Sequence, residues 1–272
     1  MVKNMDYLIT LDTGTTNTRA FLWCKDGTLL SSHKIETGVA RTAINGNNQE
    51  LCEGIKCCVE IILQQANIRA TEVECILASG MITSDMGLKE VPHLTAPVGL
   101  AELAEGIHEA SFPNITPIPF FFIPGMKNQM KSFNSHNWRS MDIMRGEETE
   151  AIALLEKVPQ NVPSILVLPG SHTKFIKAEN GKLTDCLTTL TGELLSALTQ
   201  HTLLANTVGK QFVQPESYCE SMVRLGYETA RKTGLSRAAF CARILKQQKN
   251  YTHSEMANYL LGAVLEQDLR AL

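Results

Sequence analysis

The chain has no apolar segment long enough to cross a membrane. Its longest apolar run, residues 115–124, is interrupted by Pro117 and Pro119, and a membrane-spanning helix needs about 20 apolar residues. The N-terminus also lacks the apolar core of a signal peptide. We therefore expect a cytoplasmic protein that has no membrane partner.

Patterns typical of metal sites and disulfide frameworks are also missing. None of the eight cysteines forms a C-x₂-C pair, and none of the seven histidines forms an H-x₃-H pair. The cysteines mostly lie in apolar helix or strand patterns. We therefore expect reduced thiols in the core and no transition metal bound by protein ligands.

The chain also has no large excess of positive or negative charge. The net charge is −3, and the basic clusters at Arg231-Lys232 and residues 237–249 lie on predicted helix surfaces. This balance gives no electrostatic case for a nucleic-acid partner. The length of 272 residues and the hydrophobic content of 44% suit a globular protein of two domains.

The most informative feature that is present begins at residue 7. Residues 7–11 predict a buried strand that delivers Asp12 to its end, and strands at 20–23 and 28–35 follow. Between the first two strands lies a tight polar turn made of Gly14, Thr15, Thr16 and Asn17. Backbone N–H groups and Thr hydroxyls can hold phosphoryl oxygens, and a carboxylate can hold hydrated Mg²⁺. The alternative is a hairpin whose turn is polar and binds nothing.

The next segments predict an α/β domain of order β-β-β-α-β-α-β. After a loop at 37–47, a helix over residues 51–66 is capped by Asn47 or Asn48, and a strand at 75–78 runs into Ser79-Gly80. A helix face at 100–107 and a strand at 118–123 complete the domain. Residues 126–141 are polar and irregular, which predicts a mobile loop or lid.

Around residue 160 the opening pattern restarts. A strand at 164–168, a turn at 169–174, and strands at 175–178 and 182–190 repeat the order of the first module. Helices are predicted from Thr191, over about 216–232, over about 236–249 after a break at Gly234, and over about 253–271. Two such modules predict two similar domains, 1–145 and 146–272, that face each other across a cleft.

Several motifs, in this order, resemble one enzyme family. They are residues 12–20 (DTGTTNTRA), 79–82 (SGMI), 123–125 (IPG), 144–149 (MRGEET), 168–174 (LPGSHTK) and 190–193 (LTGE). The first loop resembles the acetate and sugar kinase/Hsp70/actin superfamily, and the whole set resembles the 2-dehydro-3-deoxygalactonokinases. The resemblance covers nearly the whole chain.

This resemblance implies an α/β fold of two ribonuclease-H-like domains, of the actin and sugar-kinase type. It implies an ATP-dependent phosphotransferase that phosphorylates O6 of 2-dehydro-3-deoxy-D-galactonate during galactonate breakdown, with Mg²⁺. The family usually continues with a strand, a Gly-rich turn and a helix that help to hold adenosine. We expect this chain to lack that element, either through truncation or because this variant binds nucleotide with less protein.

The residue chemistry assigns roles to the two turns and to nearby acids. Asp12 would orient the metal ion, and two turns would hold the polyphosphate: Gly14, Thr15, Thr16 and Asn17 in one, Gly170, Ser171, His172, Thr173 and Lys174 in the other. His172 could equally stabilise its own turn. Glu147 is the preferred general base and Asp142 the second candidate. An acid that only stabilises the start of a helix is an equal alternative for Glu147.

The sugar acid needs a partner for its carboxylate. Arg145 is the first candidate because its planar fork can bind a carboxylate or a phosphate, and Arg19 and Arg41 are weaker candidates. Ser79 and Gly80 could line the sugar pocket. Both C4 epimers, the galactonate and the gluconate derivative, remain candidate substrates, and a homodimer is an open possibility.

Two other functions stay open at this point. One is a nucleotide-binding regulator or chaperone-like ATPase of the same fold, which would need an added DNA-binding or peptide-binding module. The other is a weakly active relative of the kinase that binds ligand and turns over slowly.

Overall fold

The computed structural model describes residues 6–130, 134–159 and 162–272, which form two compact units. The N-terminal unit contains Met1–Leu166 and Ile176–Cys186, and the C-terminal unit contains Val167–Phe175 and Leu187–Leu272. The predicted domain boundary between residues 145 and 146 falls inside the first unit. The division into domains 1–145 and 146–272 stays a prediction. Among the described residues, no helix has both the length and the apolar character needed to cross a bilayer.

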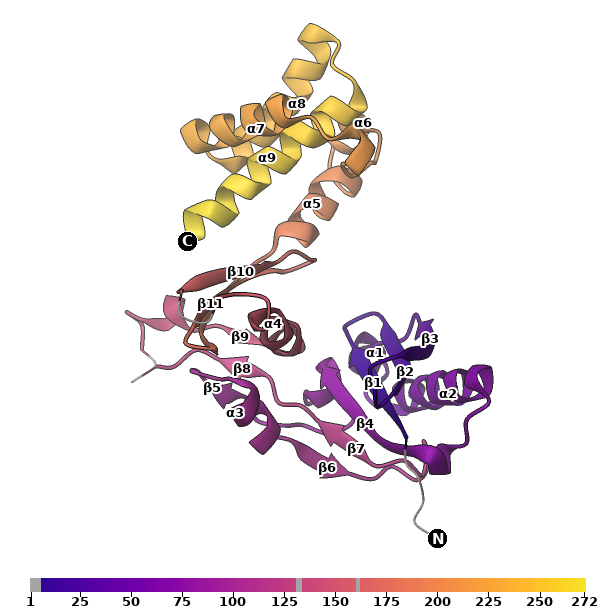
Figure 1. Ribbon diagram of the computed structural model, residues 1–272. Coiled ribbons are helices and arrows are strands. Elements are labelled where there is room, and N and C mark those ends of the chain that lie inside the picture. Colours follow the sequence, from indigo (N-terminus) through magenta and orange to yellow (C-terminus); the bar gives the residue numbers. More distant parts are fainter. Residues whose placement is uncertain (1–5, 131–133, 160–161) are drawn as a thin grey trace. The chain divides into compact units, whose positions relative to one another are not determined.

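The N-terminal unit is built on a six-stranded sheet of order β3-β2-β1-β4-β7-β6 (Figure 1). The central strand β1 pairs antiparallel with β2 and parallel with β4, and β4 pairs parallel with β7. The predicted α/β fold class is confirmed, and the β1–β2 and β2–β3 pairs are both antiparallel. The strands are β1 (Tyr7–Thr13), β2 (Thr18–Cys24), β3 (Leu29–Ile35), β4 (Val73–Gly80), β6 (His108–Ala110) and β7 (Phe120–Phe122).

Helix α2 (Gln49–Ala66) covers this sheet beside β2 and β3, as Figure 1 shows. Its buried side chains recur at helical spacing and join the core of the sheet: Leu51, Ile55, Cys58, Val59, Ile62 and Leu63. Asn48 occupies the capping position, but its side chain donates to Gly87 O rather than capping the helix, while Asn47 Oδ1 accepts a hydrogen bond from Gln49 N at 3.1 Å. The amphipathic pattern therefore predicted the helix and its start correctly.

Two predicted loops are more ordered than the sequence indicated. The loop at 37–47 contains the short helix α1 (Ala40–Asn45), and the irregular segment at 126–141 contains β8 (Met126–Lys127) and a 3₁₀ helix (Trp138–Ser140). Residues 131–133 of that segment lie outside the described residues. Strands β5 (Leu94–Thr95), β8 and β9 (Ile143–Met144) form a second, small sheet, and β5, β6 and β9 were not predicted.

A buried asparagine explains the order at β8. Asn128 donates to the carbonyl oxygens of Ser140 and Cys186 at 2.9 and 2.8 Å, and its Oδ1 accepts from Cys186 N at 2.8 Å. A polar side chain buried in this way is stabilised only when its hydrogen bonds are made. These partners are 12 and 58 residues away in the sequence, so local periodicity could not reveal them.

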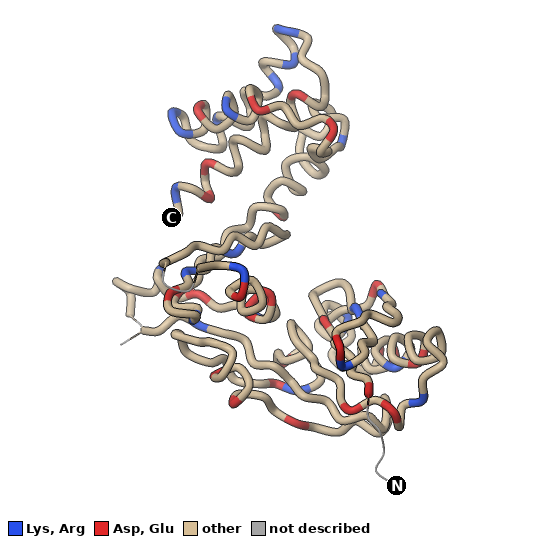
Figure 2. The backbone as a smooth tube through the Cα atoms, in the orientation of Figure 1, with Lys and Arg blue, Asp and Glu red and all other residues tan. Residues whose placement is uncertain are grey.

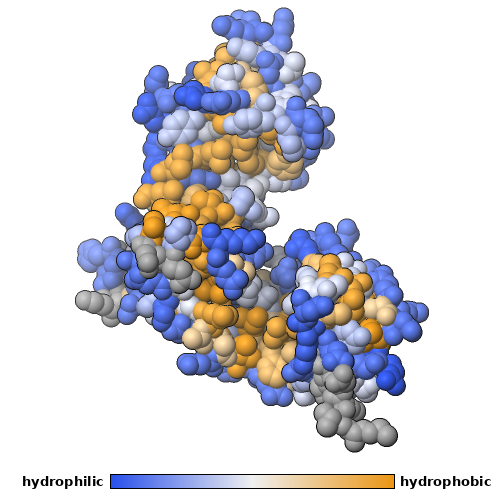
Figure 3. All heavy atoms as spheres, viewed as in Figure 1, coloured by the Kyte–Doolittle hydropathy of each residue, from blue (hydrophilic) through white to orange (hydrophobic). Residues whose placement is uncertain are grey.

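The remaining elements of the N-terminal unit include α3 (Leu100–Glu105), α4 (Glu147–Leu155) and 3₁₀ helices at Ala70–Glu72 and Met81–Thr83. A third sheet has the order β10-β11-β12, and each of its strands, Ser164–Leu168, Thr173–Glu179 and Lys182–Thr189, contains residues of both units. Ile165 and Val167 on β10 are about half exposed, and apolar surface follows this strand in Figure 3.

The C-terminal unit is mainly helical. Its helices are α5 (Thr191–Gln200), α6 (Ala205–Val208), α7 (Glu220–Thr233), α8 (Leu235–Lys249) and α9 (His253–Ala271), with a 3₁₀ helix at Pro215–Ser217. Gly234 separates α7 from α8 as predicted, whereas α6 was missed. Figure 2 shows charges of both signs along α7, where Arg224 pairs with Glu220 and Arg231 with Glu228.

Helices α7 and α9 approach so closely that only glycine fits at their crossing. A Cβ atom on Gly226 would lie 1.8 Å from the Tyr259 carbonyl oxygen, and one on Gly262 would lie 1.8 Å from the Val223 carbonyl oxygen. The obstructing atoms are backbone, so a side chain could be accommodated only by moving a helix.

We predict that Gly226→Ala lowers the free energy of unfolding by about 1–3 kcal/mol, because overpacking a tight contact forces the backbone to shift. Gly54→Ala in α2 is the matched control, since its Cβ would meet only side-chain atoms, namely the flexible end of Ile35 at 2.7 Å and Thr37 at 3.4 and 3.5 Å. Urea denaturation followed by circular dichroism measures both. Equal losses of stability in the two variants would contradict this account of the α7–α9 crossing.

Candidate functional site

Asp12 lies near the end of β1, between two neighbouring strands. In the sheet register it is opposite Arg19 of β2 and Ser79 of β4. Its carboxylate accepts a hydrogen bond from Arg19 Nη1 at 3.1 Å, and both side chains are about half exposed. The structure therefore brings three predicted site residues together at one edge, with a carboxylate that solvent and ligands can reach.

The turn after Asp12 has a defined shape. Gly14 N donates to Asn17 O at 2.8 Å, while Val39 N and Ala40 N donate to the carbonyl oxygens of Gly14 and Thr15. Gly38 presses on the turn so closely that a Cβ atom there would lie 2.5 Å from both of those oxygens.

The side chains of this turn are available to a ligand. Thr15 and Thr16 are exposed, and the Thr16 hydroxyl accepts from Asn17 Nδ2 at 2.9 Å. Hydroxyls on a short turn next to an exposed carboxylate suit a phosphoryl group and its counter-ion.

Two glycines bring the start of α4 close to Asp12. Gly80, at φ +84°, leaves no room for a Cβ atom, which would lie 2.6 Å from Thr13 O and 3.1 Å from Asp12 Oδ1. Gly146, at φ +108°, would place a Cβ atom 3.2 Å from the Cα atom of Gly80. Such positive φ values favour glycine at both positions.

The acids of α4 have different environments. Glu147 Oε2 accepts from Arg145 N at 3.1 Å, whereas Glu148 is fully buried and accepts from Gly146 N at 2.8 and 2.9 Å. Burial raises the pKa of Glu148 to about 8. Glu147, the preferred general base, is therefore the less buried of the two adjacent acids. The second candidate, Asp142, accepts from Ile143 N at 2.7 Å.

The sequence interpretation did not single out Glu150. Its pKa is raised by burial and then by the nearby carboxylates of Asp12 and Glu147. Spacing was the available signal, because residues three apart on a helix share a face. The carboxylate of Asp12 at the end of β1 and the carboxylates of α4 are thus close enough to interact electrostatically.

Arg145 is held inside the unit by neighbouring segments. Its Nη1 donates to Thr83 Oγ1 at 2.7 Å and its Nη2 donates to Val91 O at 2.9 Å, while His93 Nδ1 lies 3.4 Å away. Burial lowers the pKa of Arg145, and burial together with Arg145 lowers the pKa of His93 to about 4. Arg41 instead pairs with Glu50 at 3.2 Å.

The second predicted turn belongs to the C-terminal unit and is shorter than expected. Gly170, Ser171 and His172 form its exposed part, but Thr173 and Lys174 are buried and begin β11. Lys174 Nζ donates to Thr188 Oγ1 at 2.8 Å. The predicted turn at 169–174 with a strand at 175–178 is therefore corrected, because the returning strand already begins at Thr173.

Helix α5 supports this turn. The amides of Gly192 and Glu193 donate to Ser171 O at 3.0 and 3.1 Å, and His172 Nε2 lies 3.1 Å from Glu193 Oε1. A Cβ atom on Gly192 would lie 2.4 Å from Gly170 O. The helix start is tied in turn to α9, since Thr191 Oγ1 donates to the buried carboxylate of Asp268 at 2.7 Å.

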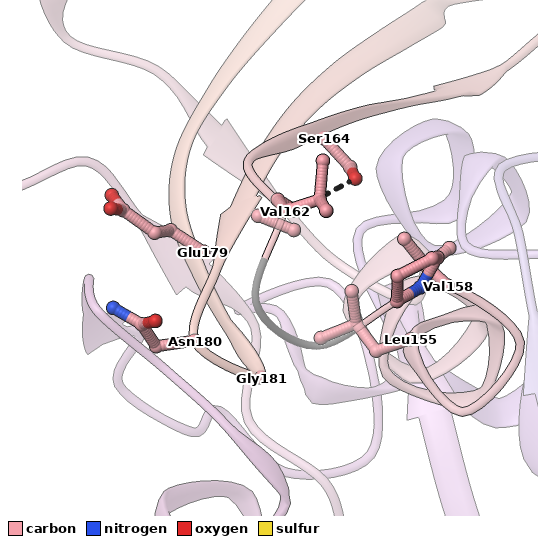
Figure 4. Close-up of a pocket in the computed structure, with 9 residues that line it drawn as sticks. Leu155, Val158, Val162, Ser164, Glu179, Asn180 and Gly181 are labelled. Carbon is pink, nitrogen blue, oxygen red and sulfur yellow. Dashed lines mark hydrogen bonds between the residues drawn. The ribbon is translucent and has the colours of Figure 1, made fainter.

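A small hollow beside β11 and the end of α4 does not belong to this site. Figure 4 shows apolar side chains of Leu155, Val158 and Val162 around it. The hollow has room for about one water molecule. None of the predicted site residues is among the described residues that line it. Over the described parts of the chain, no three His, Cys, Asp or Glu side chains come together as a metal-binding group.

Comparison with known proteins gives a consistent family. A family model described as 2-keto-3-deoxy-galactonokinase matches residues 12–272. The chain is 28% identical over 216 residues to the 2-dehydro-3-deoxygalactonokinase of Escherichia coli (strain K12), which covers 79% of this chain and 64% of that protein. It is 24% identical over 204 residues to a "Probable 2-dehydro-3-deoxygalactonokinase" of Rhizobium meliloti (strain 1021), covering 75% of this chain and 60% of that protein.

The chain thus spans less than two thirds of the length of these two relatives. A solved structure with the same fold is the crystal structure of a "putative 2-dehydro-3-deoxygalactonokinase protein" from Sinorhizobium meliloti. That comparison has a TM-score of 0.75 at 20% identity and covers 96% of this chain and 80% of that chain.

The buried Glu148 leads to a prediction about pH. Its pKa is 4.5 in an ordinary setting and about 8 in the folded chain, so above pH 4.5 the folded state binds more protons than the unfolded state. The free energy of unfolding must then fall as the pH rises, until the pH passes about 8. The pKa of His93 is lowered from 6.5 to about 4. Its contribution makes the free energy of unfolding rise with pH, but only below about pH 6.5.

The measurement is urea denaturation between about pH 6.5 and 8.5, a window chosen from these two pKa values. We expect stability to decline across the window in the natural chain and to decline less in Glu148→Gln. Glu156→Gln, at the exposed end of the same helix, should follow the natural chain. Parallel curves for all three proteins would contradict the assignment.

Proposed function

Since the chain belongs to the 2-keto-3-deoxy-galactonokinase family, we propose that it is an ATP-dependent kinase for 2-dehydro-3-deoxy-D-galactonate. In this reaction the 6-hydroxyl oxygen of the sugar acid attacks the γ-phosphorus of ATP. The bond between the γ-phosphorus and the oxygen that bridges it to the β-phosphate breaks, and ADP leaves. The hydroxyl proton passes to an acceptor. We place the reaction in galactonate breakdown and in the cytoplasm, where ATP is supplied.

The observation that carries the proposal is the meeting of Asp12, its polar turn and the start of α4 in the N-terminal unit. Phosphoryl transfer depends on alignment and on charge near the transferred group more than on covalent catalysis. An exposed carboxylate, exposed Thr15 and Thr16, and acids on a neighbouring helix start are the groups that such a site requires. The turn at Gly170, Ser171 and His172 is proposed to contact the nucleotide phosphates.

The site fits Mg²⁺ in the manner usual for phosphate-bound magnesium. That ion takes one or two carboxylates and keeps its other positions for water and phosphate oxygens. Asp12 supplies one carboxylate, about 45% exposed, beside a turn that carries hydroxyls. When bound, the ion would neutralise negative charge on the phosphate oxygens, and Asp12 would orient it.

Proton acceptance is assigned to Glu147. Its neighbour Glu148 is fully buried and bonded to Gly146 N, which leaves Glu147 as the acid of this pair that a substrate hydroxyl can approach. Asp142 is the second candidate.

The sugar-acid carboxylate is assigned to Arg19 and Arg145, with Ser79 and Gly80 beside them. Arg145 already donates to Thr83 and Val91, whereas Arg19 is half exposed next to Asp12. Arg19 is therefore the stronger candidate for direct contact.

A coupled assay that detects ADP tests the proposed function. The natural chain, ATP and Mg²⁺ are incubated with 2-dehydro-3-deoxygalactonate, with its gluconate epimer, and without sugar. We expect ADP formation that depends on sugar and is faster with the galactonate derivative. ATP hydrolysis that is independent of sugar would contradict the kinase, and equal rates with both epimers would contradict the assigned substrate.

Asp12→Asn should lower turnover at least tenfold, because the neutral amide no longer attracts the metal ion while the side-chain shape is kept. Asp26→Asn is the matched control, since Asp26 lies in the exposed Lys25–Gly27 hairpin turn of the same sheet. The coupled assay measures kcat in both variants. A wild-type kcat in Asp12→Asn would remove its metal role.

Glu147→Gln should lower kcat by about 10²–10⁴-fold, the usual contribution of a general base, with little change in the KM for ATP. Asp142→Asn serves as the comparison and should retain most activity. If Asp142→Asn shows the larger loss, the base is Asp142 and the assignment to Glu147 is wrong.

Arg19→Gln should raise the KM for the sugar acid more than the KM for ATP, because the substitution removes a cation that faces the carboxylate. Arg41→Gln, which breaks the ion pair with Glu50, is the control. Equal increases in both KM values for Arg19→Gln would argue against a carboxylate contact.

A further inference from the structure

We infer that Glu148 is a positioning residue: its buried carboxyl group fixes the amide of Gly146 and so sets the place of Glu147 beside Asp12. The catalytic role of Glu147 rests on the proposed function, whereas the hydrogen bond between Glu148 and the Gly146 amide does not. The sequence places two acids side by side at a helix start, and the structure separates them into one that faces inward and one that does not.

The first step is the anchor. Glu148 is fully buried, and its two carboxyl oxygens lie 2.8 and 2.9 Å from Gly146 N. The charged groups that act on it are Glu147 and Arg145. Burying a carboxyl group costs free energy unless the group is hydrogen-bonded. The bond to the Gly146 amide therefore explains why a glutamate can occupy this buried position.

The second step is the restraint on Gly146. Its carbonyl oxygen accepts from Thr149 N at 3.1 Å and from Thr149 Oγ1 at 2.6 Å. Its φ of +108° is one that residues with side chains rarely adopt, and a Cβ atom there would lie in tight contact with Gly80, 3.2 Å from its Cα atom. Glu148 therefore binds the amide group of Gly146, and Thr149 binds its carbonyl group. These hydrogen bonds together restrain the position of the first turn of α4.

The third step connects this turn to the reacting groups. Glu147 follows Gly146 directly and accepts a hydrogen bond from Arg145 N at 3.1 Å. A Cβ atom on Gly146 would lie 3.2 Å from the Gly80 Cα atom, and a Cβ atom on Gly80 would lie 3.1 Å from Asp12 Oδ1, so the three residues are packed closely. A shift of Gly146 would therefore move Glu147 relative to Asp12. A displacement of about 1 Å in such a site costs about 100-fold in rate.

The test compares Glu148→Leu, which keeps the apolar stem and removes the acceptor, with Glu148→Gln, which keeps an acceptor oxygen. Glu156→Leu, on the exposed end of α4, is the matched control. The coupled assay gives kcat and KM, and nuclear magnetic resonance of ¹⁵N-labelled protein gives the shift and exchange rate of the Gly146 amide.

We expect kcat to fall at least tenfold in Glu148→Leu, with the KM for ATP changed less than about twofold, because the loss is in alignment rather than in binding. Glu148→Gln should recover most of that loss. In Glu148→Leu the Gly146 amide should shift and exchange faster, and in Glu156→Leu it should not.

Two results would overturn the inference. One is an unchanged shift and exchange rate of the Gly146 amide in Glu148→Leu, and the other is a wild-type kcat in that variant. If the natural chain has no kinase activity, the proposed function fails, while the amide measurement still decides whether Glu148 holds Gly146.

Discussion

The N-terminal unit depends on a contact between backbones at Gly80. On one side a Cβ atom would meet Thr13 O and Asp12 Oδ1, and on the other Gly146 would press its own Cβ atom on the Gly80 Cα atom. Three segments that are far apart in the sequence therefore meet with no side chain between them. Because packed interiors yield little to added volume, this contact fixes how far the acids of α4 lie from Asp12.

The same physical device recurs at the second turn. In the C-terminal unit, Gly192 at the start of α5 lies against Gly170 and Ser171, as Gly38 lies against Gly14 and Thr15 in the other unit. In each case a glycine from a neighbouring segment supports a short polar turn whose exposed side chains are left for a ligand. The amides of α5 add two hydrogen bonds to Ser171 O. The shape of each turn is thus set by packing behind it.

Much of the framework could be predicted because it follows local rules. Buried side chains alternate along β1 and recur at helical spacing along α2, and Gly234 marked the break between α7 and α8. The Asp12 turn was found because its residue types are unusual at the end of an apolar strand. Family motifs added the order of the remaining segments.

The features that were missed depend on tertiary contacts. The order of β8 comes from Asn128 and its partners Ser140 and Cys186, and Lys174 is buried because β11 begins before the apolar run. The choice between Glu147 and Glu148 could be stated only as a preference. Their environments differ because of Gly146 and its neighbours, which no spacing rule reveals.

The most direct test of the account adds one methyl group at the backbone contact. Gly146→Ala would place a Cβ atom 3.2 Å from the Gly80 Cα atom, whereas Gly27→Ala, also at a positive φ, would meet nothing within 4 Å. We predict that kcat for phosphorylation of 2-dehydro-3-deoxygalactonate falls at least tenfold in Gly146→Ala, since about 1 Å of displacement is costly, and changes little in Gly27→Ala. A wild-type kcat in Gly146→Ala, or equal losses in both variants, would contradict it.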